Sequence, residues 1–225
     1  MSVAVCCPRC GGDVRPPNLM HAEWRCDRCG PVAPLHLAPS ISLDVIASVT
    51  QRAAPPGRAD RLPVWCPWPL LPGWTVTGAA WAGDERAGAR ATAVALAGPA
   101  PLTTGPADAV FIAEDPGVGL GNSLGGIPGT DPGPALRDAA ERSAPHAKVK
   151  AAGHPTPLWA VASGPGRCAY VGEARGVWLF VLTWPAQAGY LLAEEIQLQD
   201  LVESVPAELV FGAPSTRLRP VAREE

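Results

Sequence analysis

The chain has 225 residues and a formal net charge of −3, so no excess of positive charge is present to favour a nucleic acid partner. Its strongest apolar run, residues 177–184, ends at Pro185. That run is far shorter than the about 20 residues of a membrane-spanning helix, so we expect no membrane association. The 27 prolines and 24 glycines predict short strands and frequent turns rather than long helices.

The first residues lack a charged segment followed by an apolar one, so we expect no export signal. Seven cysteines are an odd number, and four of them fall into two pairs with the spacing of metal ligands. This usage indicates the reducing cytoplasm rather than a disulfide-bonded secreted protein.

Two C-x2-C pairs near the N-terminus, Cys7 with Cys10 and Cys26 with Cys29, have the spacing of a zinc site. Each pair supplies two thiolates from one tight turn, and the residues between the pairs bring the two turns together. Cys6 with Cys10 is an alternative first pair, but the C-P-x-C-G turn that begins at Cys7 fits the pattern better. Zinc is the expected metal and iron the alternative, because the spacing does not distinguish them.

Four thiolates fill a tetrahedron and leave no position for water or substrate, so the predicted Zn²⁺ is structural. It compensates for the small apolar surface of so short a segment. Gly11 and Gly30 follow the second cysteine of each pair, where a positive φ lets the backbone curl around the metal. We expect Val14 and Trp24 to form the small apolar layer, and His36 to be an exposed ribbon residue.

The predicted organisation has four parts in chain order. They are a zinc ribbon over residues 1–38, a short helix and linker over 39–60, an α+β domain over 61–212 and a disordered tail over 213–225. Ser42 is a suitable N-cap for a helix over residues 41–53, and the prolines at 55 and 56 end it.

From about residue 61 onward, short apolar runs alternate with turns, which is typical of strands. The runs lie at residues 74–82, 91–97, 109–113, 147–151, 158–162, 168–171 and 177–183. Their connections are mostly too short for crossover helices, so the sheet should be mainly antiparallel with a few helices. The spacing of Leu198, Leu201, Val202 and Val205 predicts an amphipathic helix. The clustered tryptophans at 65, 68, 74 and 81, together with Cys66 and Cys168, are expected to be packing residues.

The stretch at 114–133 contains seven glycines and predicts a long loop. It includes a G-x-S-x-G match at 121–125, but the glycines and prolines that follow do not predict the helix that a hydrolase nucleophile needs. Backbone N–H groups at Gly117, Gly119 and Gly121 are candidates for binding an anion. A surface loop without a ligand is the alternative interpretation.

His146, Lys148 and Lys150 share one face of a strand predicted at residues 146–150, and His154 follows in a turn. These two lysines are the only ones in the chain. Our hypothesis is that this basic stripe and the glycine-rich loop form a site for a small anionic ligand. The alternative is a solvated outer face of an antiparallel strand.

The segments "CPRCGG", "CDRCG", "EDPGVGLG", "DPGP", "GHPTPLW" and "YVGEARGVWLF" together resemble a family of actinobacterial proteins of unassigned function. The resemblance extends over nearly the whole chain. It implies an N-terminal zinc ribbon and a bacterial cytosolic setting, and it implies no particular activity.

The sequence therefore favours a cytosolic zinc-ribbon protein that binds a protein or small-molecule partner. The alternative is an enzyme that acts on an anionic acyl or phosphoryl substrate at the glycine-rich loop, with the basic stripe supplying charge or proton transfer.

Overall fold

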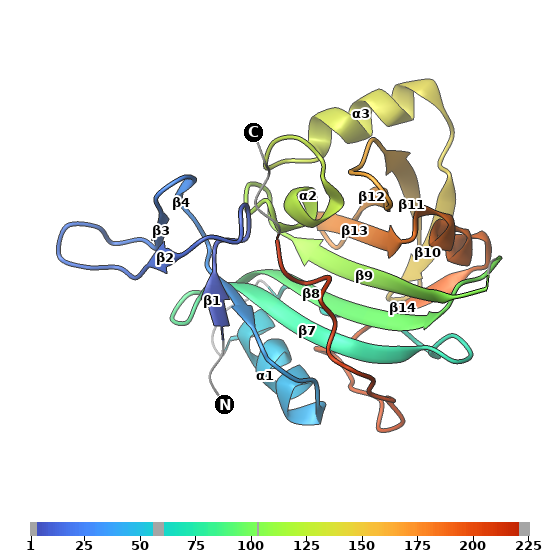
Figure 1. The fold of residues 1–225 in the computed structure, drawn as a ribbon, viewed down its shortest axis with the longest axis horizontal. Helices are drawn as coiled ribbons and strands as arrows, with labels where there is room; N and C mark the ends of the chain where they lie inside the picture. The colour runs from blue at the N-terminus through green and yellow to red at the C-terminus, as the bar shows by residue number, and fades with distance from the viewer. Residues whose placement is uncertain (1–3, 56–60, 103, 221–225) are drawn as a thin grey trace.

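The computed structural model describes residues 4–55, 61–102 and 104–220 (Figure 1). Within these residues, eleven strands form one large sheet and three short strands form the ribbon sheet. The ribbon sheet consists of β2 (Val14–Arg15), β3 (Arg25–Cys26) and β4 (Gly30–Pro31). The large sheet consists of β1 (Ala4–Cys6), β5 (Leu35–Leu37), β6 (Trp65–Pro67), β7 (Thr75–Asp84), β8 (Gly88–Pro99), β9 (Pro106–Glu114), β10 (Ala147–Ala151), β11 (His154–Val161), β12 (Cys168–Ala174), β13 (Val177–Trp184) and β14 (Ile196–Asp200).

The strand order of the large sheet is β1-β5-β7-β8-β9-β13-β12-β11-β10-β14-β6. Every neighbouring pair is antiparallel except β10 and β14. The predicted α+β class with a mainly antiparallel sheet is confirmed, and each of the seven predicted runs lies on a strand. β1 and β5 belong to this sheet, so residues 35–37, which the sequence placed in the ribbon, pair with β7.

The large sheet curls, and its edge strand β6 contacts β8 and β9. Side chains alternate between the two faces of each strand. On β9, Ala109 and Phe111 belong to one apolar core, called the inner core below. Val110 and Ile112 belong to a second apolar core on the other face, called the outer core. Two apolar cores therefore lie on the two faces of the same sheet.

Helices cover both faces. The inner core includes residues of α1 (Leu43–Ala53) and of the 3₁₀ helix η1 (Ala186–Ala193). The outer core includes residues of α2 (Leu120–Gly125) and α3 (Gly133–Arg142). The predicted helix at 41–53 is confirmed, because the Ser42 side chain accepts a hydrogen bond from the Val45 N–H and so caps α1.

Three expectations for local structure are wrong. The helix predicted from Leu198 to Val205 is absent: Leu198 lies on β14, whose residues Ile196, Leu198 and Asp200 are buried with the period of a strand, and a turn follows at 201–203. The glycine-rich stretch carries α2 and leads into α3, so it is not a loop without structure. His36 is buried rather than exposed, since its ring stacks on Trp81 with ring centroids 3.8 Å apart.

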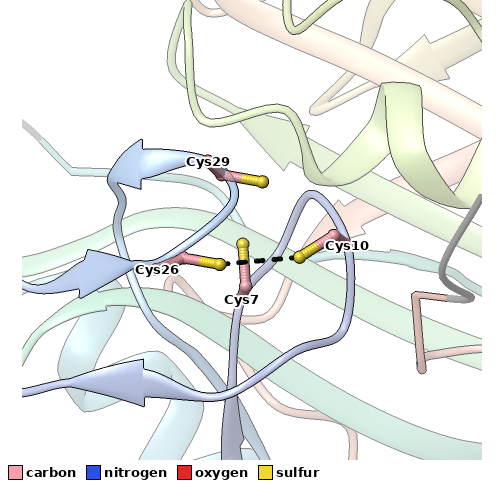
Figure 2. Close-up of side chains that lie close together, drawn as sticks. All are labelled: Cys7, Cys10, Cys26 and Cys29. Atoms are coloured by element: carbon pink, nitrogen blue, oxygen red, sulfur yellow. Dashed lines mark hydrogen bonds between the residues drawn. The ribbon is translucent and has the colours of Figure 1, made fainter.

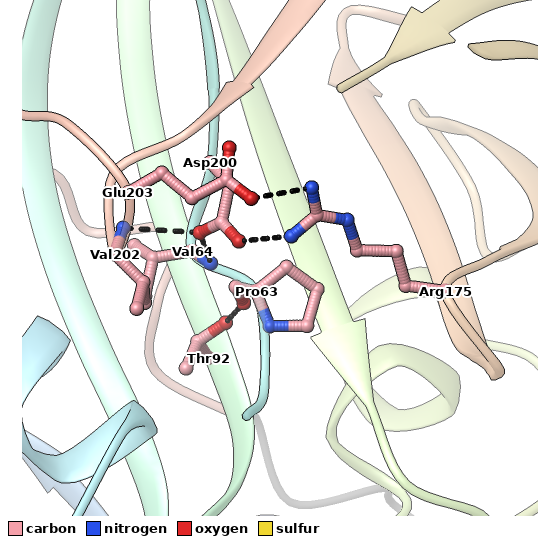
Figure 3. Close-up of polar contacts among 7 residues, drawn as sticks. All are labelled: Pro63, Val64, Thr92, Arg175, Asp200, Val202 and Glu203. Atoms are coloured by element: carbon pink, nitrogen blue, oxygen red, sulfur yellow. Dashed lines mark hydrogen bonds and ion pairs between the residues drawn. The ribbon is translucent and has the colours of Figure 1, made fainter. Parts of the chain in front are cut away.

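A buried carboxylate connects the β14–β6 end of the large sheet to its central strands (Figure 3). Asp200 accepts hydrogen bonds from the N–H groups of Val64 and Val202 and from Arg175 Nη1, at 2.9–3.0 Å. Arg175 lies in the β12–β13 turn with φ +56°, and its other terminal nitrogen pairs with Glu203 at 2.6 Å. Asp200 thereby ties β14, the segment before β6 and the β12–β13 hairpin together.

The segment 213–220, predicted as part of a disordered tail, packs on the outer face. Leu218 is buried in the outer core, and Arg217 pairs with Asp108 at 2.9 Å. Residues 56–60 of the predicted linker and the chain end at 221–225 lie outside the described residues.

Candidate metal centre and adjoining cleft

The four predicted ligands converge in the ribbon (Figure 2). The sulfur atoms of Cys7, Cys10, Cys26 and Cys29 all lie within 4.8 Å of one another, and those of Cys10 and Cys26 are 3.6 Å apart. A tetrahedral site with Zn–S bonds of about 2.3 Å has S–S separations of about 3.8 Å. The donor set therefore fits one tetrahedral metal ion.

Backbone turns fix the first pair of sulfurs. The Cys7 N–H donates to the Gly12 carbonyl, and the Gly11 N–H donates to the Cys7 carbonyl, at 2.8 and 2.9 Å. Gly11 and Gly30 have φ of +69° and +71°, as expected for the residue after each cysteine pair. A residue with a side chain would be strained at both turns.

The small core of the ribbon consists of the cysteines together with Val14 and Val32. Trp24, which the sequence placed in this layer, instead donates from Nε1 to Asp84 on the β7 end at 3.0 Å. Cys6 is not in the cysteine group found among the described residues, because it lies on β1 opposite Leu35. The first pair in the group is therefore Cys7 with Cys10, and the alternative pair of Cys6 with Cys10 is not formed.

Without a metal ion, burial disfavours the charged thiolate form at three of the four cysteines. Burial raises the pKa of the Cys7 thiol, and it raises the pKa of Cys29 as well. Burial acts in the same direction at Cys10, but the Gly12 N–H and the neighbouring thiols lower the pKa of Cys10 overall. A bound metal ion displaces these protons and stabilises the thiolates together.

Arg9, in the first cysteine turn, connects the ribbon to the glycine-rich stretch. Its Nη2 donates to the Gly117 carbonyl at 2.7 Å and its Nε to the Val118 carbonyl at 3.0 Å. Its Nη1 reaches the Cys29 carbonyl at 3.3 Å, and the Ser123 hydroxyl donates back to the Arg9 carbonyl at 2.9 Å. One side chain thus holds both cysteine turns and the loop.

Glu114, which the sequence did not single out, organises that loop. Its carboxylate is fully buried at the end of β9 and accepts hydrogen bonds from the N–H groups of Gly119 and Gly121, both at 2.6 Å. Burial raises the pKa of Glu114 to about 7, although these N–H groups act in the opposite direction. Two of the amides predicted to bind an external anion therefore bind a side chain of the chain itself.

The basic stripe lies elsewhere on the sheet. Lys148 and Lys150 share the outward side of β10, as predicted, but β13, β12 and β11 separate this strand from β9. Lys150 pairs with Glu195 at 2.9 Å, and His146 accepts the Ala160 N–H at Nδ1. His154 begins β11 and is exposed.

A cleft of ≈ 330 Å³ lies between the ribbon and the large sheet. Its ribbon wall contains Arg9, Trp24 and Val32, and its opposite wall contains the turn between β7 and β8. Arg90 also lines it and donates to the Pro116 carbonyl at 3.2 Å, next to the carbonyls that Arg9 holds. The cleft therefore depends on the docking of the ribbon.

In the part of the chain that the structure describes, no helix has the length and apolar character needed to span a bilayer. Comparison with protein families matches residues 1–218 to a family of unknown function, DUF6758. Searches of curated proteins and of solved structures gave no match.

Proposed function

Since the chain belongs to the family of unknown function DUF6758, we propose a role from its own geometry: a metal-stabilised binding protein. Cys7, Cys10, Cys26 and Cys29 hold one structural Zn²⁺, which fixes the ribbon as a wall of the cleft beside β7 and β8. The cleft receives a protein segment or small ligand in the cytoplasm, where the thiols stay reduced. The resemblance to actinobacterial zinc-ribbon proteins supports the same metal.

The observation that carries this proposal is the bridging by Arg9. Its hydrogen bonds to Gly117, Val118 and Cys29 join the metal-holding turns to the loop at one end of the cleft. Hydrogen bonds that involve a charged group contribute about 1.5–3 kcal/mol each. Metal binding and the shape of the cleft are therefore coupled through this contact.

The pairing of the polar groups favours a binding role over catalysis. The glycine amides that an anionic substrate would need are bonded to Glu114, and Lys150 is paired with Glu195. A cleft of ≈ 330 Å³ lies within the range of small-molecule sites, which starts at about 300 Å³.

Elemental analysis tests the metal. Protein purified under reducing conditions should contain one zinc per chain, and Cys26→Ser should lose it. Cys6→Ser is the matched control and should keep it, because Cys6 lies on β1 outside the cysteine group. Absence of stoichiometric zinc from the unaltered chain would overturn the assignment.

Amide NMR tests the cleft. Zinc-loaded, isotope-labelled protein is titrated with a library of small charged and aromatic molecules and short peptides. Shifts should gather at Trp24, Val32, Val118 and the turn between β7 and β8. Shifts that gather instead on β10 around Lys148 would favour the basic stripe and contradict the proposal.

A further inference from the structure

The hairpin that joins β2 to β3 ends in two large apolar side chains. Leu19 and Met20 have relative exposures of 106% and 84%, so both lie almost completely in solvent. Neither belongs to any of the three apolar cores that the described residues form. Single exposed apolar side chains are common on protein surfaces, whereas an adjacent pair with almost no cover is not. These two side chains therefore contribute little to the stability of the fold.

The turn that presents this pair is held by Asn18. The Asn18 N–H donates to the His21 carbonyl at 2.8 Å, and the His21 N–H donates back to the Asn18 carbonyl at 3.2 Å. The side-chain oxygen of Asn18 also accepts the N–H groups of Met20 and His21, at 2.8 and 3.1 Å. Leu19 and Met20 are the two central residues of this turn, where glycine and short polar residues are usual. The turn itself does not require apolar residues at these positions.

The base of the hairpin is fixed as well. Val14 pairs with Cys26, one of the four candidate metal ligands, and Arg15 pairs with Arg25 in the same ladder. The Arg15 side chain forms an ion pair with Asp27. Figure 1 shows the hairpin extending away from the large sheet, with the turn at its far end. The backbone of the tip is therefore ordered in advance, which reduces the entropic cost of binding.

The charges around the tip balance one another. Residues 13–28 contain three acidic side chains and three arginines, and residues 16–22 contain no acidic side chain, lysine or arginine. A nucleic acid or an anionic membrane surface is bound through an excess of positive charge, which this hairpin lacks. Stable membrane anchoring by a small apolar insertion also takes a second signal. A protein is therefore the favoured partner.

The small size of the pair indicates the shape of the partner's surface. A stable interface between two copies of the chain buries about 1,200 Å² or more, and two contacting tips contribute only four side chains. On a flat surface, one side of each tip side chain would stay in water. A concave apolar pocket encloses both side chains, and the gain from burial is proportional to the apolar area removed from water.

We infer that Leu19 and Met20 form a docking tip that inserts into an apolar pocket of a different protein. Asn18 is the positioning residue, since its hydrogen bonds hold both side chains at the end of the hairpin. The inference goes beyond the proposed role of the cleft, because the residues that line the cleft include neither Leu19 nor Met20.

Photo-cross-linking from Met20 tests the inference. Met1 is the other methionine of the chain, so photo-methionine places a reactive diazirine at position 20 and at one terminal position. The full, zinc-loaded chain is irradiated in an extract of the cells that contain it naturally. A protein adduct should form with the unaltered sequence. It should be absent with Met20→Leu, which keeps an apolar tip but carries the diazirine at position 1 alone.

Calorimetric titration with the purified, identified partner measures what the tip contributes. The double variant Leu19→Ser, Met20→Ser should bind at least about thirtyfold more weakly, a difference of about 2 kcal/mol. Its zinc content and its amide spectrum outside residues 16–23 should be unchanged, because both side chains are exposed. Leu102→Ser, at an exposed leucine between β8 and β9, is the matched control and should bind as the unaltered chain does.

Absence of an adduct that depends on Met20 would overturn the inference, and so would an unchanged affinity in the double serine variant. Co-sedimentation with vesicles of phosphatidylcholine and phosphatidylglycerol that the double variant loses would overturn it in favour of a membrane. A dimer that depends on the tip in sedimentation equilibrium would overturn it in favour of a second copy of the chain. None of these results bears on the zinc content or on ligand binding at the cleft, which are measured separately.

Discussion

The Arg9 side chain donates a 2.7 Å hydrogen bond to the carbonyl oxygen of Gly117, which joins the first cysteine turn to the loop after β9. These residues are 108 positions apart in the chain. The contact makes the ribbon part of the larger fold rather than an independent appendage, because the same guanidinium also reaches the second cysteine turn.

Replacing Arg9 by glutamine should release the ribbon from the loop. Two strong hydrogen bonds to half-buried carbonyls are lost, so we expect the free energy of unfolding to fall by about 3–6 kcal/mol. Hydrogen exchange at residues 115–121 should accelerate while zinc content stays the same. Arg137→Gln on α3 is the control. Unchanged exchange in the loop would contradict the bridging role.

Glu114 should make stability depend on pH. Its pKa is raised to about 7 in the folded chain from an ordinary value of 4.5. The folded state therefore favours the protonated form, and this stabilisation is fully present below pH 4.5 and is lost as the pH rises through 7. The shift corresponds to a loss of about 3 kcal/mol.

The measurement is the difference in urea unfolding free energy between the unaltered chain and Glu114→Gln, from pH 5.5 to 8. The unaltered chain should lose stability relative to the glutamine variant as the pH rises. Taking the difference removes any pH dependence that comes from the cysteine group, which both proteins share. A constant difference across this range would show that Glu114 does not titrate there.

Asp200→Asn should weaken the connection between the β14–β6 edge of the sheet and the β12–β13 hairpin. The variant removes the charge that faces Arg175 but keeps one oxygen for the Val64 and Val202 N–H groups. We expect a loss of about 2–3 kcal/mol in thermal or urea unfolding. Glu203→Gln breaks the exposed half of the same network and should cost only about 0–1 kcal/mol. Equal losses in the two variants would contradict the central role of Asp200.

Leu218→Ala tests whether the segment 213–220 belongs to the fold. Leu218 is 5% exposed and packs in the outer core, so truncation should cost about 2–5 kcal/mol. Thr216→Ala, at an exposed position two residues earlier, should be nearly neutral. If Leu218→Ala lowers the free energy of unfolding by less than about 0.5 kcal/mol, the segment 213–220 does not contribute to the fold.

The cysteine group was predictable because its ligands are defined by local spacing. Two turns of C-x2-C each place two sulfurs together, and the glycines that follow permit the φ that the turns require. The seven strands were predictable for a similar reason, since apolar runs between turn residues already carry the period of a strand. Leu198 and Leu201 misled the prediction because four apolar residues match a helix and a strand end equally well.

The sequence by itself determined the four-cysteine group, the mainly antiparallel sheet and the capped helix at Ser42, all of which depend on neighbours within a few residues. Only the tertiary structure decided what the glycine-rich stretch binds, because Glu114 and Arg9 reach it from different parts of the chain. It likewise separated the lysines of β10 from that stretch through the order of the strands. The partners of these charges and N–H groups are distant in the sequence, so the spacing of residues along the chain does not reveal them.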